Sequence, residues 1–140
     1  MYQIVYISTA KQAFNEADLK KLLLRARLHN KEAGVTGMLV FHDGTFLQAL
    51  EGEKRAVLDI FASVRTDPRH GDLIVLHRGP GPELRVFGEW SMGFADFTGA
   101  AGILKGFVRF NEQLKLNDLD GDRAVQLLAA CSLEQALKQA

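Results

Sequence analysis

The stretch "TGMLVFHDGTFLQALEG", residues 36–52, decides the fold. Its two halves, 36–42 and 45–52, are rich in apolar residues and flank the pair Asp43-Gly44. An Asp-Gly pair between two such runs is a strong signal for a two-residue β-hairpin. The sequence therefore predicts two neighbouring antiparallel strands joined by a tight turn.

The second half of this hairpin carries a polar side chain in an unexpected place. Alternate side chains of a strand share a face, so Phe46, Gln48 and Leu50 point to the same side. Gln48 thus lies between two large apolar residues on a predicted core face. A buried amide without a partner costs roughly 1–3 kcal/mol, so we expect a hydrogen-bonding partner beside it.

Strand and helix patterns alternate on both sides of the hairpin. Before the hairpin, the sequence predicts a strand over 3–9 and a helix from the N-cap Asn15 to just before Gly34. After it, the sequence predicts a second helix over about 53–66 and a fully apolar central strand over 72–78. A rigid turn over 79–82 and a fifth strand over 84–94 follow. The order β-α-β-β-α-β-β predicts an α+β protein, a ferredoxin-like plait with one added strand. Both helices are expected on one face of a mixed sheet.

The last part of the chain, residues 96–140, carries two further amphipathic patterns, over 100–116 and 122–138. Both are too apolar for helices that water surrounds on all sides. We expect these two C-terminal helices to cover the other face of the sheet or to serve as the output. The predicted organisation is a domain over 1–95 with a helical extension over 96–140.

Composition narrows the class of protein. A chain of 140 residues suits one domain, and 17 basic residues balance 17 acidic ones, so no overall charge attracts nucleic acid or an anionic membrane. No apolar run could span a bilayer, and the N-terminus lacks the pattern of a signal peptide. The single cysteine, Cys131, allows no internal disulfide. We expect a cytoplasmic protein that binds neither nucleic acid nor membrane.

Enzyme and metal signals are weak. No Gly-x-Gly-x-x-Gly motif opens a helix, and the four histidines lack zinc spacing. The acidic run over 117–123 departs from a calcium loop in the position of its glycine and lacks the closing glutamate. We therefore expect no metal and no enzyme.

Uncharged polar groups in apolar settings stand out instead. Tyr6 in the first strand offers a hydroxyl, and Gln48 offers a donor and an acceptor on one amide, and neither titrates near neutral pH. Such a pair suits a planar ligand with a polar edge, for which Leu22 and Leu23 of the first helix could supply aliphatic walls. Taken alone, His29 and Asn30 fit a helix cap, and Trp90 and Met92 fit core packing.

At this point the sequence resembles the BLUF family of blue-light sensors that use FAD. The resemblance covers roughly residues 1–95. It rests on five motifs in order: "YIS" (6–8), "HNKEAGVTGMLVF" (29–41), "FLQALEGEKRAV" (46–57), "DPRH" (67–70) and "EWSMGF" (89–94).

The resemblance implies a set of site residues and a cofactor, FAD. The implied photoswitch consists of Tyr6, Gln48, Trp90, Met92 and Ser8. The expected FAD-binding residues are Tyr6, Leu22, Leu23, His29, Asn30, Phe46, Gln48, Leu50, Asp67, Arg69 and His70. In this scheme Gln48 bonds to Tyr6 and to the polar edge of the flavin, which answers why an amide is tolerated on a core face.

Alternatives from other classes remain at this stage. A flavin-free small-molecule regulatory module can use the same ferredoxin-like fold, because this fold hosts many functions. An acylphosphatase-like enzyme would need an arginine in the loop after the first strand, where this chain has none. A flavin redox enzyme would need a catalytic acid or base and a nicotinamide site, and neither is evident.

The expected output lies outside the light-sensing part. The extension over 96–140 is too short for a catalytic effector domain. We therefore expect a downstream protein partner of unknown identity, and a homo-oligomer, a dimer or larger.

Overall fold

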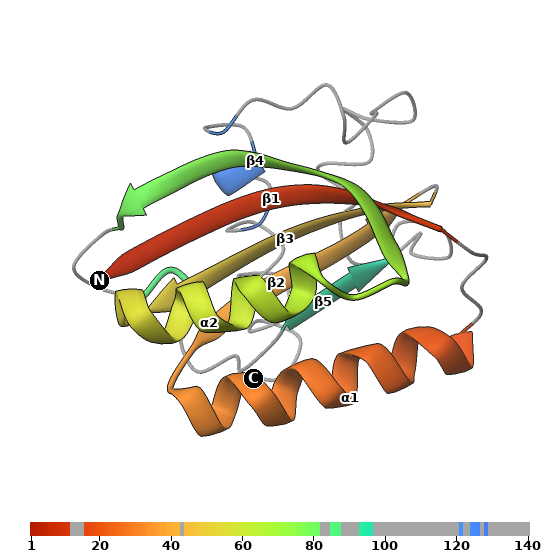
Figure 1. The fold of residues 1–140 in the computed structure, drawn as a ribbon, viewed down its shortest axis with the longest axis horizontal. Helices are drawn as coiled ribbons and strands as arrows, with labels where there is room; N and C mark the ends of the chain where they lie inside the picture. Colours follow the sequence, from red (N-terminus) through yellow and green to blue (C-terminus); the bar gives the residue numbers. More distant parts are fainter. Residues whose placement is uncertain are drawn as a thin grey trace.

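In the computed structural model, a five-stranded sheet of the order β4-β1-β3-β2-β5 carries two helices on one face (Figure 1). The structure describes residues 1–11, 16–42, 44–81, 85–87, 93–96, 121, 124–126 and 128. The elements are β1 (Tyr2–Ala10), α1 (Glu16–Ala33), β2 (Thr36–His42), β3 (Thr45–Gly52), α2 (Lys54–Arg65), β4 (His70–Pro80) and β5 (Gly93–Asp96). β2 and β5 are parallel, whereas the other neighbours are antiparallel, so the sheet is mixed as predicted.

The predicted hairpin is confirmed. β2 and β3 have the bounds that the sequence indicates, and His42 pairs with Thr45 across a two-residue turn. Gly44 in this turn has a φ of 74°, a conformation that favours glycine. The first helix ends where expected, because Gly34 adopts a φ of 70° directly after it.

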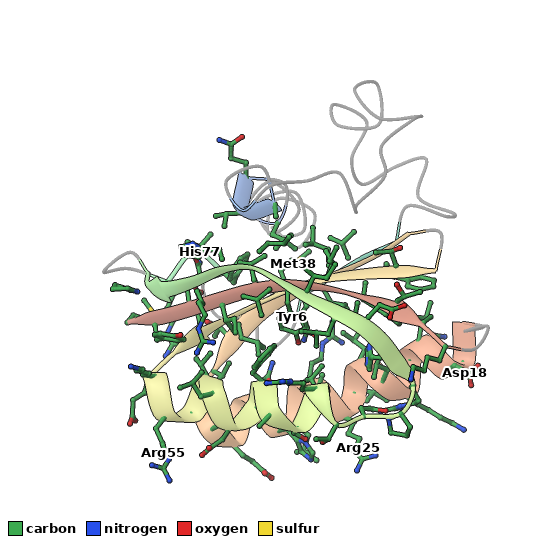
Figure 2. The ribbon with its side chains drawn as sticks, turned by 45° about the horizontal axis from the view of Figure 1, so that its top comes forward. Tyr6, Asp18, Arg25, Met38, Arg55 and His77 are labelled. Atoms are coloured by element: carbon green, nitrogen blue, oxygen red, sulfur yellow. The ribbon has the colours of Figure 1, made fainter. Side chains whose placement is uncertain are left out.

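Two apolar clusters occupy the two faces of the sheet. The helix-side cluster contains the alternate residues of the strands together with apolar residues of both helices: Ile4, Tyr6, Leu19, Leu22, Val35, Leu39, Phe41, Phe46, Leu50, Val57 and Phe61. The second-face cluster consists of Val5, Ile7, Met38, Val40, Leu47, Ala49, Phe87, Ala124 and Leu128. Tyr6 and Met38, one from each cluster, lie on opposite sides of the sheet in Figure 2.

Part of the C-terminal region contributes to the second-face cluster. Residues 121, 124–126 and 128 are helical, and Ala124 and Leu128 are fully buried. Figure 2 shows this segment on the side of the sheet opposite α1 and α2. The remainder of the two predicted C-terminal helices lies outside the described residues, and those helices stay a prediction, as does the domain boundary at residue 95.

The strand predicted as central is an edge strand. β4 is longer than the predicted 72–78 and lies at the margin of the sheet beside β1, with Ile74 54% exposed and Val75 37% exposed. Only part of its apolar run packs against the rest of the protein, one residue on each face of the sheet. Leu73 packs against the helix-side cluster and Leu76 against the second-face cluster.

Two further boundaries differ from the sequence-based prediction. The turn expected over 79–82 begins later, since Gly79 and Pro80 still belong to β4. Residues 85–87, expected within the fifth strand, are not in a strand, and β5 is Gly93–Asp96. Val86 and Phe87 donate their backbone N–H groups to the carboxylate of Glu51 and not to a neighbouring strand.

Candidate functional site

Tyr6 and Gln48 form a buried pair at the centre of the helix-side face. They lie directly opposite each other on β1 and β3, and the Tyr6 hydroxyl donates a hydrogen bond to Gln48 Oε1. The Tyr6 ring packs edge-on against Phe61, with 5.1 Å between the ring centroids. Burial raises the pKa of Tyr6 far above its usual value, so the hydroxyl keeps its proton at any physiological pH. The partner expected for Gln48 is therefore present.

A pocket of about 550 Å³ opens beside this pair, between the two helices and the sheet. This volume is within the range of roughly 300–1,000 Å³ that is typical of small-molecule sites. The pocket has aliphatic walls with polar groups at its edges. Its lining residues are Leu22, Arg25, Ala26, His29, Leu39, Gln48, Ser63, Val64, Asp67, Pro68, Arg69 and His70.

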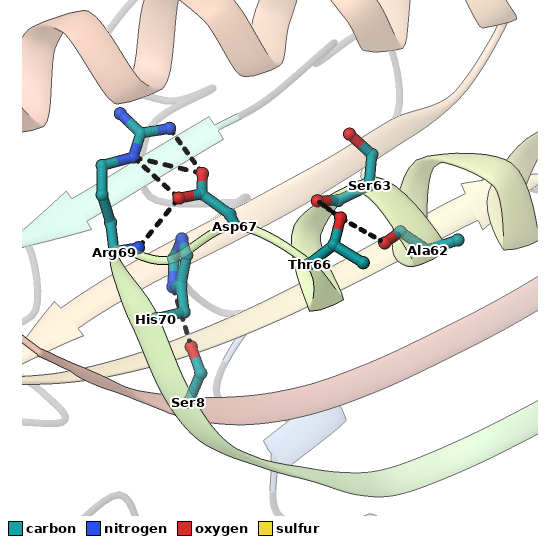
Figure 3. Close-up of polar contacts among 7 residues, drawn as sticks. All are labelled: Ser8, Ala62, Ser63, Thr66, Asp67, Arg69 and His70. Carbon is teal, nitrogen blue, oxygen red and sulfur yellow. Dashed lines mark hydrogen bonds and ion pairs between the residues drawn. The ribbon is translucent and has the colours of Figure 1, made fainter.

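The turn after α2 forms one edge of the pocket. Figure 3 shows the polar contacts of this turn. Thr66 Oγ1 donates to the carbonyls of Ala62 and Ser63, which ends the helix. Arg69 then donates to Asp67 from its backbone and from its guanidinium, and the shortest of these contacts is 2.6 Å. These hydrogen bonds lower the pKa of Asp67 to about 2, so the two side chains form a charged pair.

His70 connects this turn to the sheet. Its Nδ1 lies 3.1 Å from Ser8 Oγ, and its ring lies 4.8 Å from the ring of Phe46, centroid to centroid. Burial lowers the pKa of His70, and this effect exceeds the opposing influence of the Asp67 carboxylate. The neutral imidazole is therefore favoured at the pocket.

The structure brings many of the predicted site residues together. Six of them line the pocket: Leu22, His29, Gln48, Asp67, Arg69 and His70. Five others do not line it: Tyr6, Phe46 and Leu50 belong to the helix-side cluster, Leu23 packs against that cluster, and Asn30 is buried. Among these, Asn30 is 1% exposed, near the end of α1. Trp90 and Met92 lie outside the described residues, so their part in the site stays a prediction.

Six lining residues were not predicted: Arg25, Ala26, Leu39, Ser63, Val64 and Pro68. Arg25 and Ala26 follow Leu22 by three and four positions, so helical spacing could have found them. Leu39 is the cross-strand partner of Gln48, which the hairpin register could have indicated. No local signal marks Ser63, because its place depends on how α2 packs.

Comparison with known proteins defines the family of this chain. The model of the BLUF family, described as sensors of blue-light using FAD, matches residues 1–93. The chain belongs to the BLUF family. Residues 1–93 are therefore a blue-light sensor domain, and the cofactor of this domain is FAD. A flavin-free regulatory module is not favoured.

Curated and solved relatives agree with this assignment. Over 89 residues the chain is 34% identical to the photoactivated adenylate cyclase subunit beta of Euglena longa, a match over 64% of this chain and 10% of that protein. The chain thus spans about a tenth of the length of that relative. The solved BlsA ground state has a TM-score of 0.78 at 26% identity, over 94% of this chain and 87% of BlsA. BlrB, a BLUF protein solved in its dark state, has a TM-score of 0.75 at 24% identity, over 96% of each chain, and supports the fold alone.

The residues of the pocket fit a flavin. Leu22, Leu39 and Val64 offer flat aliphatic walls, and the Gln48 amide offers a donor and an acceptor at one edge. Arg25 brings a positive charge to the lining, which suits the anionic phosphates of FAD. No group of three or more potential metal-ligating residues occurs in the described part of the chain. No helix there is long and apolar enough to cross a membrane.

Proposed function

We propose that Tyr6 and Gln48 are the light switch of this sensor and that the pocket beside Gln48 holds the flavin ring of FAD. The observation that supports this proposal is the hydrogen bond from the Tyr6 hydroxyl to Gln48, a residue that also lines the pocket. The Gln48 amide therefore has the buried Tyr6 hydroxyl on one side and the pocket on the other.

The remaining pocket residues would hold the cofactor. Leu22 and Leu39 would contact the faces of the ring, while Asn30 and His29 at the end of α1 would contact its pyrimidine side. Arg25 and the Asp67–Arg69 pair would contact the ribityl and phosphate part. When bound, FAD supplies absorption of blue light and an excited ring that accepts an electron.

The chain's own residues determine the response to excitation. Tyr6 is held neutral by burial, so any loss of an electron from its ring releases a proton along its hydrogen bond toward Gln48 Oε1. The amide of Gln48 has different atoms at its two ends. Rotation would exchange the oxygen and nitrogen that face Tyr6 and the pocket, whereas tautomerisation would move a proton from the nitrogen to the oxygen; either change would persist as a new hydrogen-bond arrangement.

Other residues are proposed to extend this switch. Ser8 lies two positions after Tyr6 on β1, and its described partner is His70. Trp90 and Met92 are proposed to sense the rearrangement of Gln48, as the family resemblance implies. Residues 96–140 would carry that change outward.

The proposed output is a change that a separate protein reads. This chain covers 96% of the BlrB chain and 87% of the BlsA chain, so these two solved chains are of similar length. We propose that this chain acts as a sensor without an enzymatic activity of its own. Its partner and its assembly into a homo-oligomer are part of this proposal.

The decisive experiment is an absorption spectrum of the FAD-loaded protein before and after blue light. We expect a small, reversible red shift in the wild type. Tyr6→Phe and Gln48→Leu should retain bound FAD yet lose the red shift, because each removes one partner of the buried hydrogen bond. A full red shift with dark recovery in either variant would contradict the proposed switch.

A further inference from the structure

A buried carboxylate on β3 fastens the segment 85–87, which lies between β4 and β5 in the chain. Glu51 is 1% exposed and accepts hydrogen bonds from Thr36 Oγ1 at 2.9 Å, from Val86 N at 3.0 Å and from Phe87 N at 2.8 Å. Hydrogen bonds to an ionised acceptor are stronger than neutral ones. One side chain thus satisfies two backbone donors of a segment that is not itself a strand.

Arg85 reinforces this attachment from the solvent side. Its Nη1 donates to Thr36 Oγ1 at 2.8 Å and to the Glu51 carbonyl at 3.3 Å, and its Nη2 donates to the Gly34 carbonyl at 2.8 Å. The segment 85–87 is therefore tied to the beginning of β2 and to the end of β3. A displacement of β3 must strain or break these contacts.

Glu51 and Gln48 lie on opposite faces of the same strand. They are three positions apart, and side chains of a strand alternate between faces. Gln48 faces the pocket, whereas Glu51 shares its face with Leu47 and Ala49 of the second-face cluster. The Phe87 side chain is fully buried in that cluster, so Glu51 holds Phe87 against the face that is remote from the flavin pocket.

Gln3 offers a further donor on the same face of the sheet as this carboxylate. It lies directly opposite Glu51 on β1 and is 3% exposed. Its Nε2 has no hydrogen-bond partner among the described residues, an unfavourable state for a buried amide. Glu51 could therefore exchange the amides of Val86 and Phe87 for Gln3 without losing all of its donors, which gives the contact two alternative arrangements.

We propose that Glu51 is a positioning residue of the light response, which transmits a rearrangement at Gln48 along β3 to residues 85–87 on the opposite face. This inference rests on the proposed light switch at Tyr6 and Gln48. In the dark Glu51 holds Val86 and Phe87. In the light the shift of β3 loosens both contacts and releases the segment that leads to β5.

The test is amide hydrogen exchange at Val86 and Phe87 in the full chain loaded with FAD, in the dark and under blue light, with an absorption spectrum of each sample. In the wild type we expect both amides to exchange roughly tenfold faster in the light, as for the loss of one or two hydrogen bonds. Glu51→Gln keeps the volume but replaces an acceptor by a donor. In this variant the amides of Val86 and Phe87 should exchange fast both in the dark and in the light, and the red shift should be retained.

A second variant changes an exposed residue of the same attachment, in contrast to the buried Glu51. Arg85 is exposed, so Arg85→Ala removes no buried side chain and should fold. It should likewise reduce the difference between dark and light at Val86 and Phe87. Glu53→Gln and Arg78→Ala change exposed residues of the same types away from the segment, and should behave as the wild type.

The outcomes separate the two proposals. A wild type with a red shift but equal exchange in dark and light would overturn the role of Glu51 and leave the switch intact. Variants that exchange faster in the dark yet keep the tenfold light response would show that Glu51 only stabilises the fold, which also overturns the inference. A wild type without any red shift would overturn the proposed function, and this inference with it.

Discussion

Ser8 on β1 and His70 at the start of β4 are joined through their side chains, with 3.1 Å between Ser8 Oγ and His70 Nδ1 (Figure 3). Phe46 of β3 lies against the same imidazole, so His70 contacts side chains from two neighbouring strands. His70 also lines the pocket proposed for the flavin. Its protonation state therefore affects the sheet and the pocket together.

The first prediction concerns the pH dependence of stability. Burial lowers the pKa of His70 in the folded protein below its usual value of 6.5. Below pH 6.5 the unfolded state therefore binds a proton at His70 more readily than the folded state does. Stability from this group is present above pH 6.5 and is lost as the pH falls through the lowered pKa. We expect the urea midpoint to fall between pH 7.5 and pH 5.

His70→Gln should reduce this pH dependence, because an amide can still hydrogen-bond Ser8 but does not titrate. His29→Gln is the matched control, since His29 is an exposed histidine that also lines the pocket. An unchanged pH dependence in His70→Gln would contradict the prediction.

The second prediction concerns the Asp67–Arg69 pair. The pKa of Asp67 is about 2 in the folded protein, against a usual value of 3.8, chiefly because the Arg69 side chain donates hydrogen bonds to it. The folded pKa is lowered, so this stabilisation is present above pH 3.8 and is lost as the pH falls toward 2. Asp67→Asn should lower the free energy of unfolding at pH 7 by about 1 kcal/mol and have little effect near pH 2.

Chemical denaturation at both pH values measures this difference. Asp59→Asn is a suitable control, because Asp59 is exposed and its contact with Arg55 is 3.8 Å long. Equal destabilisation of Asp67→Asn at both pH values would show that the charge of Asp67 is not the cause.

The third prediction places the flavin. Ala26 lines the pocket on α1, so Ala26→Phe should fill it with an aromatic ring. We expect FAD binding at least roughly tenfold weaker, since overpacking typically costs about 1–3 kcal/mol. Leu24→Phe is the control, because Leu24 is 64% exposed. Fluorescence titration with FAD measures both affinities, and unchanged binding in Ala26→Phe would exclude this pocket.

The fourth prediction concerns the C-terminal region. If residues 96–140 relay the signal, their amide exchange should change on illumination, as expected for a local opening of lower free energy than global unfolding. Trp90→Ala should weaken this change, because it removes the proposed link from Gln48. Identical exchange in dark and light throughout 96–140 would assign the output to another surface.

Local sequence patterns determined much of this protein. The hairpin over 36–52 follows from an Asp-Gly turn between two apolar runs, and α1 ends where Gly34 follows it, because these signals depend only on neighbouring residues. Gln48 was recognisable as a site residue because a strand alternates, and an amide on its core face requires a partner. Spaced motifs in the right order indicated the family.

Only the tertiary structure decided which distant segments meet. β4 lies at the edge of the sheet, although its apolar run predicted a central strand, because an apolar run does not record which strands pair with it. Residues 85–87 are not in a strand, because the backbone donors of Val86 and Phe87 bind Glu51, 35 and 36 residues away in the chain. Ser63 joins the pocket only through the packing of α2 on the sheet. Such contacts depend on which distant segments lie close together in three dimensions, and no local sequence pattern predicts that proximity.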